Sequence, residues 1–137
     1  MEQEPDPSST PPRARRRLVA DAKELSVIQR SYDLALWAIP LVERFPRSQR
    51  SLLGDRIQST LHDLLEGLLE AKYTPSPRRL QLLDRANLQL TRLRFQLRLA
   101  ADLGHLRERS WLHACTLVDG IGREVGGWRR SAAGRGS

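Results

Sequence analysis

Cysteine, lysine and aromatic side chains are scarce in this sequence of 137 residues. The single cysteine, Cys115, excludes an internal disulfide and is compatible with a reducing compartment. No apolar run approaches the roughly 20 residues of a membrane span. The basic residues near the N-terminus are not followed by the apolar segment of a secretory signal. We therefore expect a cytoplasmic protein with no membrane contact.

Patterns of catalytic and metal-binding residues are also missing. His62, His105 and His113 fall on three separate segments, and no pair has the spacing of metal ligands. Cys115 lies in an apolar stripe, which is typical of an inert packing thiol. Neither a phosphate-binding glycine loop nor a Glu-x-x-His pair occurs. We therefore predict no catalytic residue, no metal site, no cofactor and no enzymatic activity.

Positive charge, by contrast, is abundant. The net charge is +7, and 23 residues are Lys or Arg, of which only Lys23 and Lys72 are lysine. Guanidinium groups suit phosphates and stack on bases, so nucleic acid is the first candidate partner and an anionic membrane surface the second. The tryptophans do not cluster with the arginines, which disfavours the membrane. A high-GC genome is an alternative cause of the excess of arginine over lysine.

Leucine dominates the 39% of hydrophobic residues, and the pattern favours helices throughout. Amphipathic spacing predicts helices over about 21–44, 48–73, 77–102 and 107–128, joined by short connections. This predicts an all-α protein, an up-down-up-down four-helix bundle over residues 20–130. Residues 1–19, rich in Pro and Arg, are predicted to be a disordered tail, and residues 131–137 a flexible one. The cluster Arg13–Arg17 is either a solvated tail or an arm that closes over phosphates.

Apolar stripes predict which faces are buried. The second and third helices have the core stripes Leu53, Ile57, Leu61, Leu64, Leu68, Ala71 and Leu82, Leu83, Ala86, Leu90, Leu93, Leu97, Ala100. The first helix is expected to bury two apolar sides, one against the bundle core and one against a second subunit, and one of these sides comprises Leu25, Ile28, Tyr32, Ala35, Ile39 and Val42. Second apolar sides comprise Val27, Leu34, Trp37, Leu41 and Phe45 in the first helix, and Leu88, Phe95, Leu99 and Leu103 in the third. Such second sides predict contact with another subunit.

Local signals predict where the helices begin, bend and end. Ser48 and Ser76 are expected N-caps, with Pro77 in the first position of its helix. Gly104 is an expected C-terminal stop. Pro40 is expected to kink the first helix, because it removes one backbone hydrogen bond.

The third helix carries the strongest functional signal. From Pro75 to Arg98 six arginines face a single acid, Asp84. We assign nucleic-acid binding to these six and to two arginines near the C-terminus: Arg78, Arg79, Arg85, Arg92, Arg94, Arg98, Arg129 and Arg130. Three of them, at intervals of seven residues, share one stripe about 21 Å long, which could track several phosphates. The alternative is pairing with Asp63, Glu66 and Glu70, but such pairing cannot consume a net charge of +7.

Four segments occur in a recognisable order: Tyr32-Asp33-Leu34-Ala35-Leu36-Trp37, Phe45 to Ile57, Leu82 to Leu103, and Ile121 to Trp128. Together they resemble the accessory variability proteins of diversity-generating retroelements. That family is similar in turn to the four-helix-bundle proteins encoded in intervening sequences of ribosomal RNA genes. The resemblance covers roughly residues 22–130 and leaves out the basic tail.

The resemblance implies a homopentamer in which bundles surround a central axis as a barrel. It also implies binding to a reverse transcriptase and to structured template RNA, cDNA or an RNA–DNA hybrid. The protein would support mutagenic cDNA synthesis without catalysing it. A structural homo-oligomer of the ribosomal intervening-sequence type, with no dedicated RNA partner, is the alternative.

The motif residues themselves are predicted to be architectural: Trp37, Phe45, Pro46, Arg47, Gly54, Arg56, Gly126, Gly127 and Trp128. Pro46 and Arg47 are expected to end the first helix and set the turn. Gly54 predicts close approach of another helix, because glycine inside a helix costs about 1 kcal/mol relative to alanine. Gly126 and Gly127 are expected to end the last helix and let Trp128 fold back onto the bundle.

Overall fold

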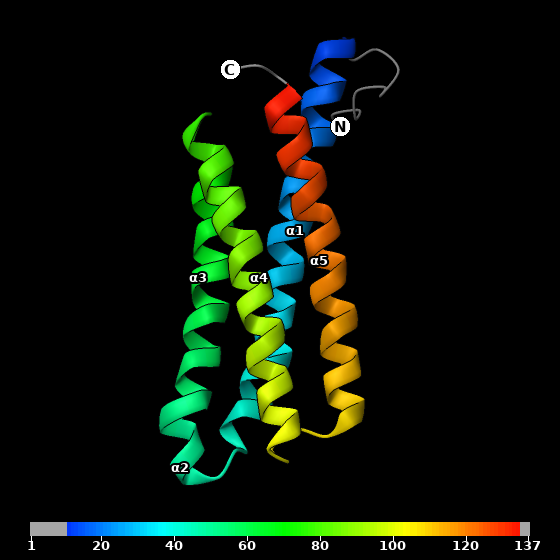
Figure 1. Ribbon diagram of the computed structural model, residues 1–137. Coiled ribbons are helices and arrows are strands. Elements are labelled where there is room, and N and C mark those ends of the chain that lie inside the picture. The colour runs from blue at the N-terminus through cyan, green and yellow to red at the C-terminus, as the bar shows by residue number, and fades with distance from the viewer. Residues whose placement is uncertain (1–10, 135–137) are drawn as a thin grey trace, which may run out of the picture.

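Helices account for all the regular secondary structure in residues 11–134, which the computed structural model describes. In chain order they are α1 (Pro12–Glu43), α2 (Arg47–Gln49), the π-helical segment η2 (Arg50–Gly54), α3 (Asp55–Lys72), α4 (Arg78–Asp102) and α5 (Glu108–Gly134). The long helices α1, α3, α4 and α5 alternate in direction along one bundle axis (Figure 1). The predicted fold, an up-down-up-down four-helix bundle, is confirmed.

The four long helices form a ring in which each packs on two neighbours. α1 contacts α3 and α5, and α4 contacts the same two helices from the other side. α1 and α4 therefore lie on a diagonal of the bundle. The predicted core stripes of α3 and α4 are buried along their whole length. Full burial of each leucine or isoleucine side chain stabilises the folded state by roughly 1.5–3 kcal/mol.

Of the two apolar sides predicted for α1, the side with Val27 and Leu34 supplies most of the core face. The buried residues are Glu24, Val27, Ser31, Leu34, Ala38 and Val42. Leu25 and Tyr32, on the other predicted side, are 52% and 51% exposed. The polar residues Glu24 and Ser31 lie on this buried face, so its apolar pattern is weak in the sequence. Small Ser31 and Ala38 leave room for the neighbouring helices to approach.

α1 and α5 extend beyond their predicted ends. α1 begins at Pro12, so residues 12–19 are helical where a tail was predicted. Proline suits the first position of a helix, and the arginines, alanines and leucine that follow are good helix formers. α5 continues to Gly134 and includes residues expected to fray. The rest of both predicted tails, residues 1–10 and 135–137, lies outside the described part of the chain.

Neither serine predicted as an N-cap has that role. At α2 the N-cap is Pro46, and its carbonyl accepts hydrogen bonds from the backbone N–H groups of Gln49 and Arg50. At α4 the N-cap is Pro77, again without a side-chain cap. In both cases the backbone closes the first turn on a proline carbonyl. Pro40 lies inside α1, as expected.

Gly104 ends α4 as predicted. Its φ of +82° is in the left-handed region, which favours glycine. The His105 N–H donates to the Ala100 carbonyl at 2.8 Å and the Gly104 N–H donates to the Ala101 carbonyl at 3.0 Å. This pair of bonds is a Schellman motif, which satisfies the last carbonyls of the helix.

Candidate nucleic-acid interface

The arginines of α4 surround the part of that helix that is not in the core. Arg78, Arg85 and Arg92 are all exposed and lie on one stripe, as the seven-residue spacing predicts. Arg85 and Arg92 have no ion-pair partner within residues 11–134. Both side chains are therefore exposed without a direct ion pair in this part of the chain.

The first half of this stripe faces the acidic side of α3. A hollow between the two helices is lined by Arg78 and Arg85 together with Asp63, Glu66 and Glu70. Arg78 Nη2 lies 3.9 Å from Glu70 Oε1, and both side chains are more than half exposed. Such a pair contributes about 1 kcal/mol or less. The intramolecular pairing that we weighed as the alternative is therefore present at Arg78.

Two other α4 arginines are occupied by carboxylates. Arg94 Nη2 lies 2.6 Å from Asp119 of α5, and Arg98 Nε lies 3.8 Å from Asp102 one turn further along α4. The expected repulsion between Arg94 and Arg98 is thus relieved by a separate acid for each. The arginines of α4 consequently divide into paired members and the unpaired Arg85 and Arg92.

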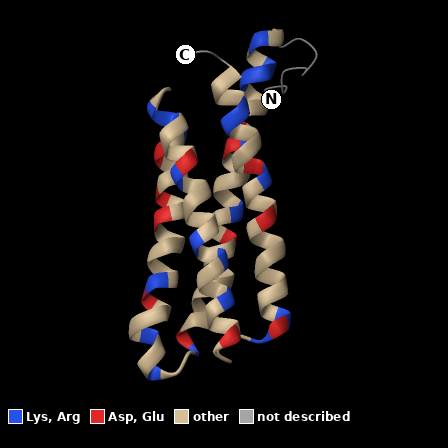
Figure 2. Cartoon of the chain, in the orientation of Figure 1, with Lys and Arg blue, Asp and Glu red and all other residues tan. Residues whose placement is uncertain are grey.

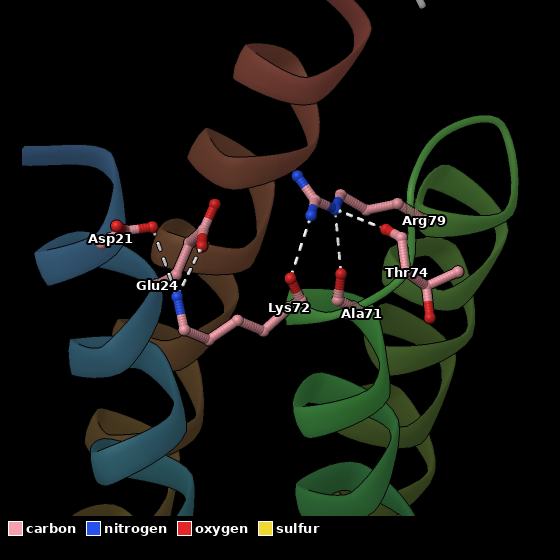
Figure 3. Close-up of polar contacts among 6 residues, drawn as sticks. All are labelled: Asp21, Glu24, Ala71, Lys72, Thr74 and Arg79. Carbon is pink, nitrogen blue, oxygen red and sulfur yellow. Dashed lines mark hydrogen bonds and ion pairs between the residues drawn. The ribbon is translucent and has the colours of Figure 1, made fainter. Parts of the chain in front are cut away.

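Arg79 has a structural role at the end of α3 (Figure 3). Its Nε donates to the carbonyls of Ala71 at 2.8 Å and Thr74 at 2.9 Å, and its Nη2 donates to the Lys72 carbonyl at 3.0 Å. These carbonyls belong to the last turn of α3 and the following turn, where the helix itself offers no donor. The guanidinium group thus caps α3 and holds the start of α4 against it.

The two arginines assigned near the C-terminus lie on α5. Arg129 forms a two-bond contact with Asp84 of α4, in which Nε donates to Oδ1 and Nη2 donates to Oδ2 at 3.2 Å. The hydrogen bond from Arg129 lowers the pKa of the Asp84 carboxyl, against a smaller opposing effect of burial. Arg130 is exposed, and its guanidinium group lies beside Gly126 and Gly127. Of this pair, only Arg130 is left unpaired within residues 11–134.

The motif residues are placed as parts of the framework. Phe45 is buried, with its ring centroid 5.8 Å from that of His105. Trp37 packs edge-on against His113 at 4.8 Å. A Cβ built on Gly54 would lie 3.0 Å from Val42 Cγ1, so the predicted close approach of the first helix is confirmed.

Other motif residues lie in or beside helices. Arg47 begins α2 after the Pro46 N-cap, and Arg56 is exposed near the start of α3. Gly126 and Gly127 do not end α5, because the helix runs through them and buries Trp128 in the core. Neither glycine has a positive φ, so neither provides the left-handed residue that commonly terminates a helix.

The N-terminal end of α1 is helical, in contrast to the predicted disordered tail. Arg13, Arg15, Arg16 and Arg17 are exposed on its first turns, where Figure 2 shows bands of Lys and Arg. The sequence prediction includes this basic cluster but not its helical conformation. An uninterrupted run of helix-forming residues after Pro12 was the signal that it is helical.

Two further findings concern the described part of the chain. No group of three His, Cys, Asp or Glu side chains in residues 11–134 is arranged to hold a metal ion. No helix in the same range combines the length and apolar character needed to cross a membrane.

The arrangement is a helical bundle with a partly neutralised arginine stripe and architectural glycine and tryptophan positions. The sequence profile of the bAvd-like family matches residues 25–132. The chain belongs to the bAvd-like family. The match contains all four segments that carry the resemblance to the accessory variability proteins, so this family assignment is confirmed. No curated protein matches the chain. The first turns of α1, with their four arginines, precede the part that the bAvd-like profile matches.

Proposed function

We propose that this bAvd-like protein is a non-catalytic accessory subunit of a diversity-generating retroelement in the cytoplasm. It binds the reverse transcriptase together with structured template RNA, its cDNA or their hybrid, and supports mutagenic cDNA synthesis. Membership of the bAvd-like family carries this proposal. The net charge of +7 and the unpaired Arg85 and Arg92 support it, because exposed guanidinium groups attract phosphates.

The proposed assembly is a homopentamer. Exposed apolar side chains lie on two diagonally opposite helices: Leu25, Tyr32 and Leu36 on α1, and Leu88, Phe95, Leu99 and Leu103 on α4. Two unlike faces on opposite sides favour head-to-tail contacts, which form a ring when the rotation between neighbouring subunits closes. The number five comes from the family resemblance.

A structural homo-oligomer without a dedicated RNA partner is the second candidate. Four arginines favour it, because each is paired with an acid of the same chain and is less available to a partner: Arg78, Arg94, Arg98 and Arg129. The genomic neighbourhood separates the two. A reverse-transcriptase gene beside an imperfect repeat pair supports the accessory subunit, and a position within a ribosomal RNA gene supports the structural oligomer.

The direct test is reconstituted cDNA synthesis. The reverse transcriptase and template RNA from the same locus are assayed with and without this protein. We expect complex formation on gel filtration and at least a tenfold increase in cDNA. Unchanged cDNA yield together with no co-elution would contradict the proposal.

Paired and unpaired arginines provide matched variants for the same assay. Arg85→Gln with Arg92→Gln removes two unpaired charges, whereas Arg94→Gln with Arg98→Gln removes two that already contact Asp119 and Asp102. We expect the first double variant to weaken RNA binding more than the second. An equal or reversed order would show that the α4 stripe does not contact RNA.

A further inference from the structure

A cluster of cations without an ion-pair partner in residues 11–134 lies at the N-terminal end of α1. An open hollow here is lined by the cations Arg13, Arg15, Arg16, Arg17 and Lys23, by the acid Asp21, and by Ser131 of α5. None of the five cations has an ion-pair partner within residues 11–134. Asp21 is the sole acid between Pro12 and Lys23, and it is already paired with Lys72.

These cations lie on the first turns of α1, at one end of the molecule. The first turns of α1 stand beside the last turns of α5 (Figure 1). Arg13 and Lys23 are separated by ten residues, which corresponds to about 15 Å along a helix. That length spans several phosphates of a nucleic-acid backbone, since one strand carries a charge about every 3.4 Å.

The same charges disfavour the helix that carries them. The positive end of the helix dipole is at the N-terminus, where cations are unfavourable. The first turn of α1 has no acidic residue, and its N-cap, Pro11, provides no side-chain bond. A bound polyanion would remove this repulsion, so binding should also strengthen the helix.

The distribution of the arginines favours nucleic acid over a membrane surface. A helix that lies on a membrane separates its cations from an apolar face. Here Leu18 and Val19 are exposed, but at about 100° per residue Arg15 lies between them on the helix surface. The arginines surround the helix, as suits a backbone with phosphates on several sides.

We propose that the first turns of α1, with the adjacent end of α5, form a nucleic-acid backbone site. Its α1 part precedes the residues that the bAvd-like profile matches, and the site is separate from the α4 stripe. The inference rests on the proposed nucleic-acid function and gives it a second point of contact. Because this contact is with phosphates, it adds affinity without adding sequence preference.

The test compares two variants that lose the same charge. The site variant carries Arg13→Gln, Arg15→Gln, Arg16→Gln and Arg17→Gln. The control carries Arg44→Gln, Arg50→Gln, Arg107→Gln and Arg109→Gln, which are exposed, have no ion-pair partner within residues 11–134 and lie at the opposite end of the bundle. Both should fold, because α1 buries no residue before Glu24 and all four control side chains are exposed.

Binding of full-length protein to a fluorescent structured RNA is measured by anisotropy across a salt series. Each phosphate contact contributes about 0.7–0.9 to the slope of log K against log salt, so the site variant should lose about 3 from the slope. We expect a smaller loss from the control. Circular dichroism with and without RNA should show helix gained on binding by the wild type and not by the site variant.

Three outcomes would overturn the site. An unchanged slope for the site variant, with the wild type still binding RNA, would refute this site and leave the proposed function intact. An equal loss in the control would show an effect of net charge alone. Binding to vesicles of anionic phosphatidylserine that depends on the four arginines, without an effect on RNA, would assign the site to a membrane. Failure of the wild type to bind RNA would overturn both proposals.

Discussion

Lys72 is one of only two lysines in the chain, and its ammonium group is enclosed between α3 and α1 (Figure 3). Nζ lies 3.1 Å from Glu24 Oε2 and 3.4 Å from Asp21 Oδ1. The side chains of Lys72 and Glu24 are 11% and 8% exposed. The pair explains how a glutamate can occupy the buried face of α1.

We expect Lys72→Met to lower the free energy of unfolding by about 3 kcal/mol, because it leaves Glu24 buried without a cation. Lys23→Met, one residue from Glu24 but exposed, removes the same charge and should change stability by less than about 0.5 kcal/mol. Urea denaturation followed by circular dichroism measures both. Equal effects would show that the pair does not stabilise the junction of α1 and α3.

The same pair predicts a loss of stability in alkali. Burial alone would lower the pKa of Lys72, but the hydrogen bonds and charges of Glu24 and Asp21 raise it above its usual 10.5. The contribution of the pair is therefore fully present below about pH 10.5 and disappears as the pH rises through the folded-state pKa. The stability difference between wild type and Lys72→Met should shrink in that range. A constant difference would contradict this assignment.

Cys115 should react slowly in the folded protein. Burial raises the pKa of its thiol, the charge of Asp119 adds to this, and Arg94 opposes it. Since the thiolate is the reactive form, we expect iodoacetamide to modify Cys115 at pH 7.5 at least tenfold more slowly in the folded protein than in urea. Mass spectrometry of timed samples measures the two rates. Equal rates would mean that the thiol is neither shielded nor perturbed.

Among the helices, the contact between α1 and the start of α3 depends on Gly54. Val42 is 1% exposed and cannot move away from a new side chain at 3.0 Å. We expect Gly54→Leu to destabilise the protein by about 1–3 kcal/mol through overpacking. Gly67 in α3 has no neighbour within 4 Å, so Gly67→Leu should be neutral or stabilising. Thermal unfolding of both variants tests this, and a wild-type melting temperature for Gly54→Leu would contradict it.

The helices differ in how well their sequences predict them. α3 and α4 have uninterrupted leucine stripes, and their buried faces could be predicted residue by residue. The buried face of α1 could not, because Glu24 becomes acceptable there only through Lys72, far away in the sequence. Glycine as a stop signal was right at Gly104, where φ is positive, and wrong at Gly126, where the helix continues.

The sequence predicts which arginines lie on α4, but not which of them contact acids or carbonyl groups of other helices. Spacing alone placed Arg85 and Arg92 on one exposed stripe. It could not show that Arg79 caps α3, or that Arg129 and Arg94 meet Asp84 and Asp119, because those contacts join different helices. Which charges stay available to a partner is decided by tertiary packing.

At the scale of the whole molecule, exposed apolar residues on α4 predict self-association. We expect a native mass about five times the 15.6 kDa of one chain. Phe95→Glu places a charge on the α4 apolar side, where Phe95 is 61% exposed, and should reduce this mass. Leu112→Glu on α5, where Leu112 is 56% exposed, serves as the control and should leave it unchanged. Light scattering after gel filtration measures the masses. A monomeric wild type would contradict the proposed assembly.

Binding of the wild-type protein to structured RNA, compared with a random DNA duplex of equal length across a salt series, tests the central proposal most directly. Neutralisation of several phosphates predicts tight binding that weakens steeply as salt rises. The accessory role further predicts a preference for the structured RNA. Absence of binding at low salt would contradict the account and would leave the positive charge to assembly or solubility.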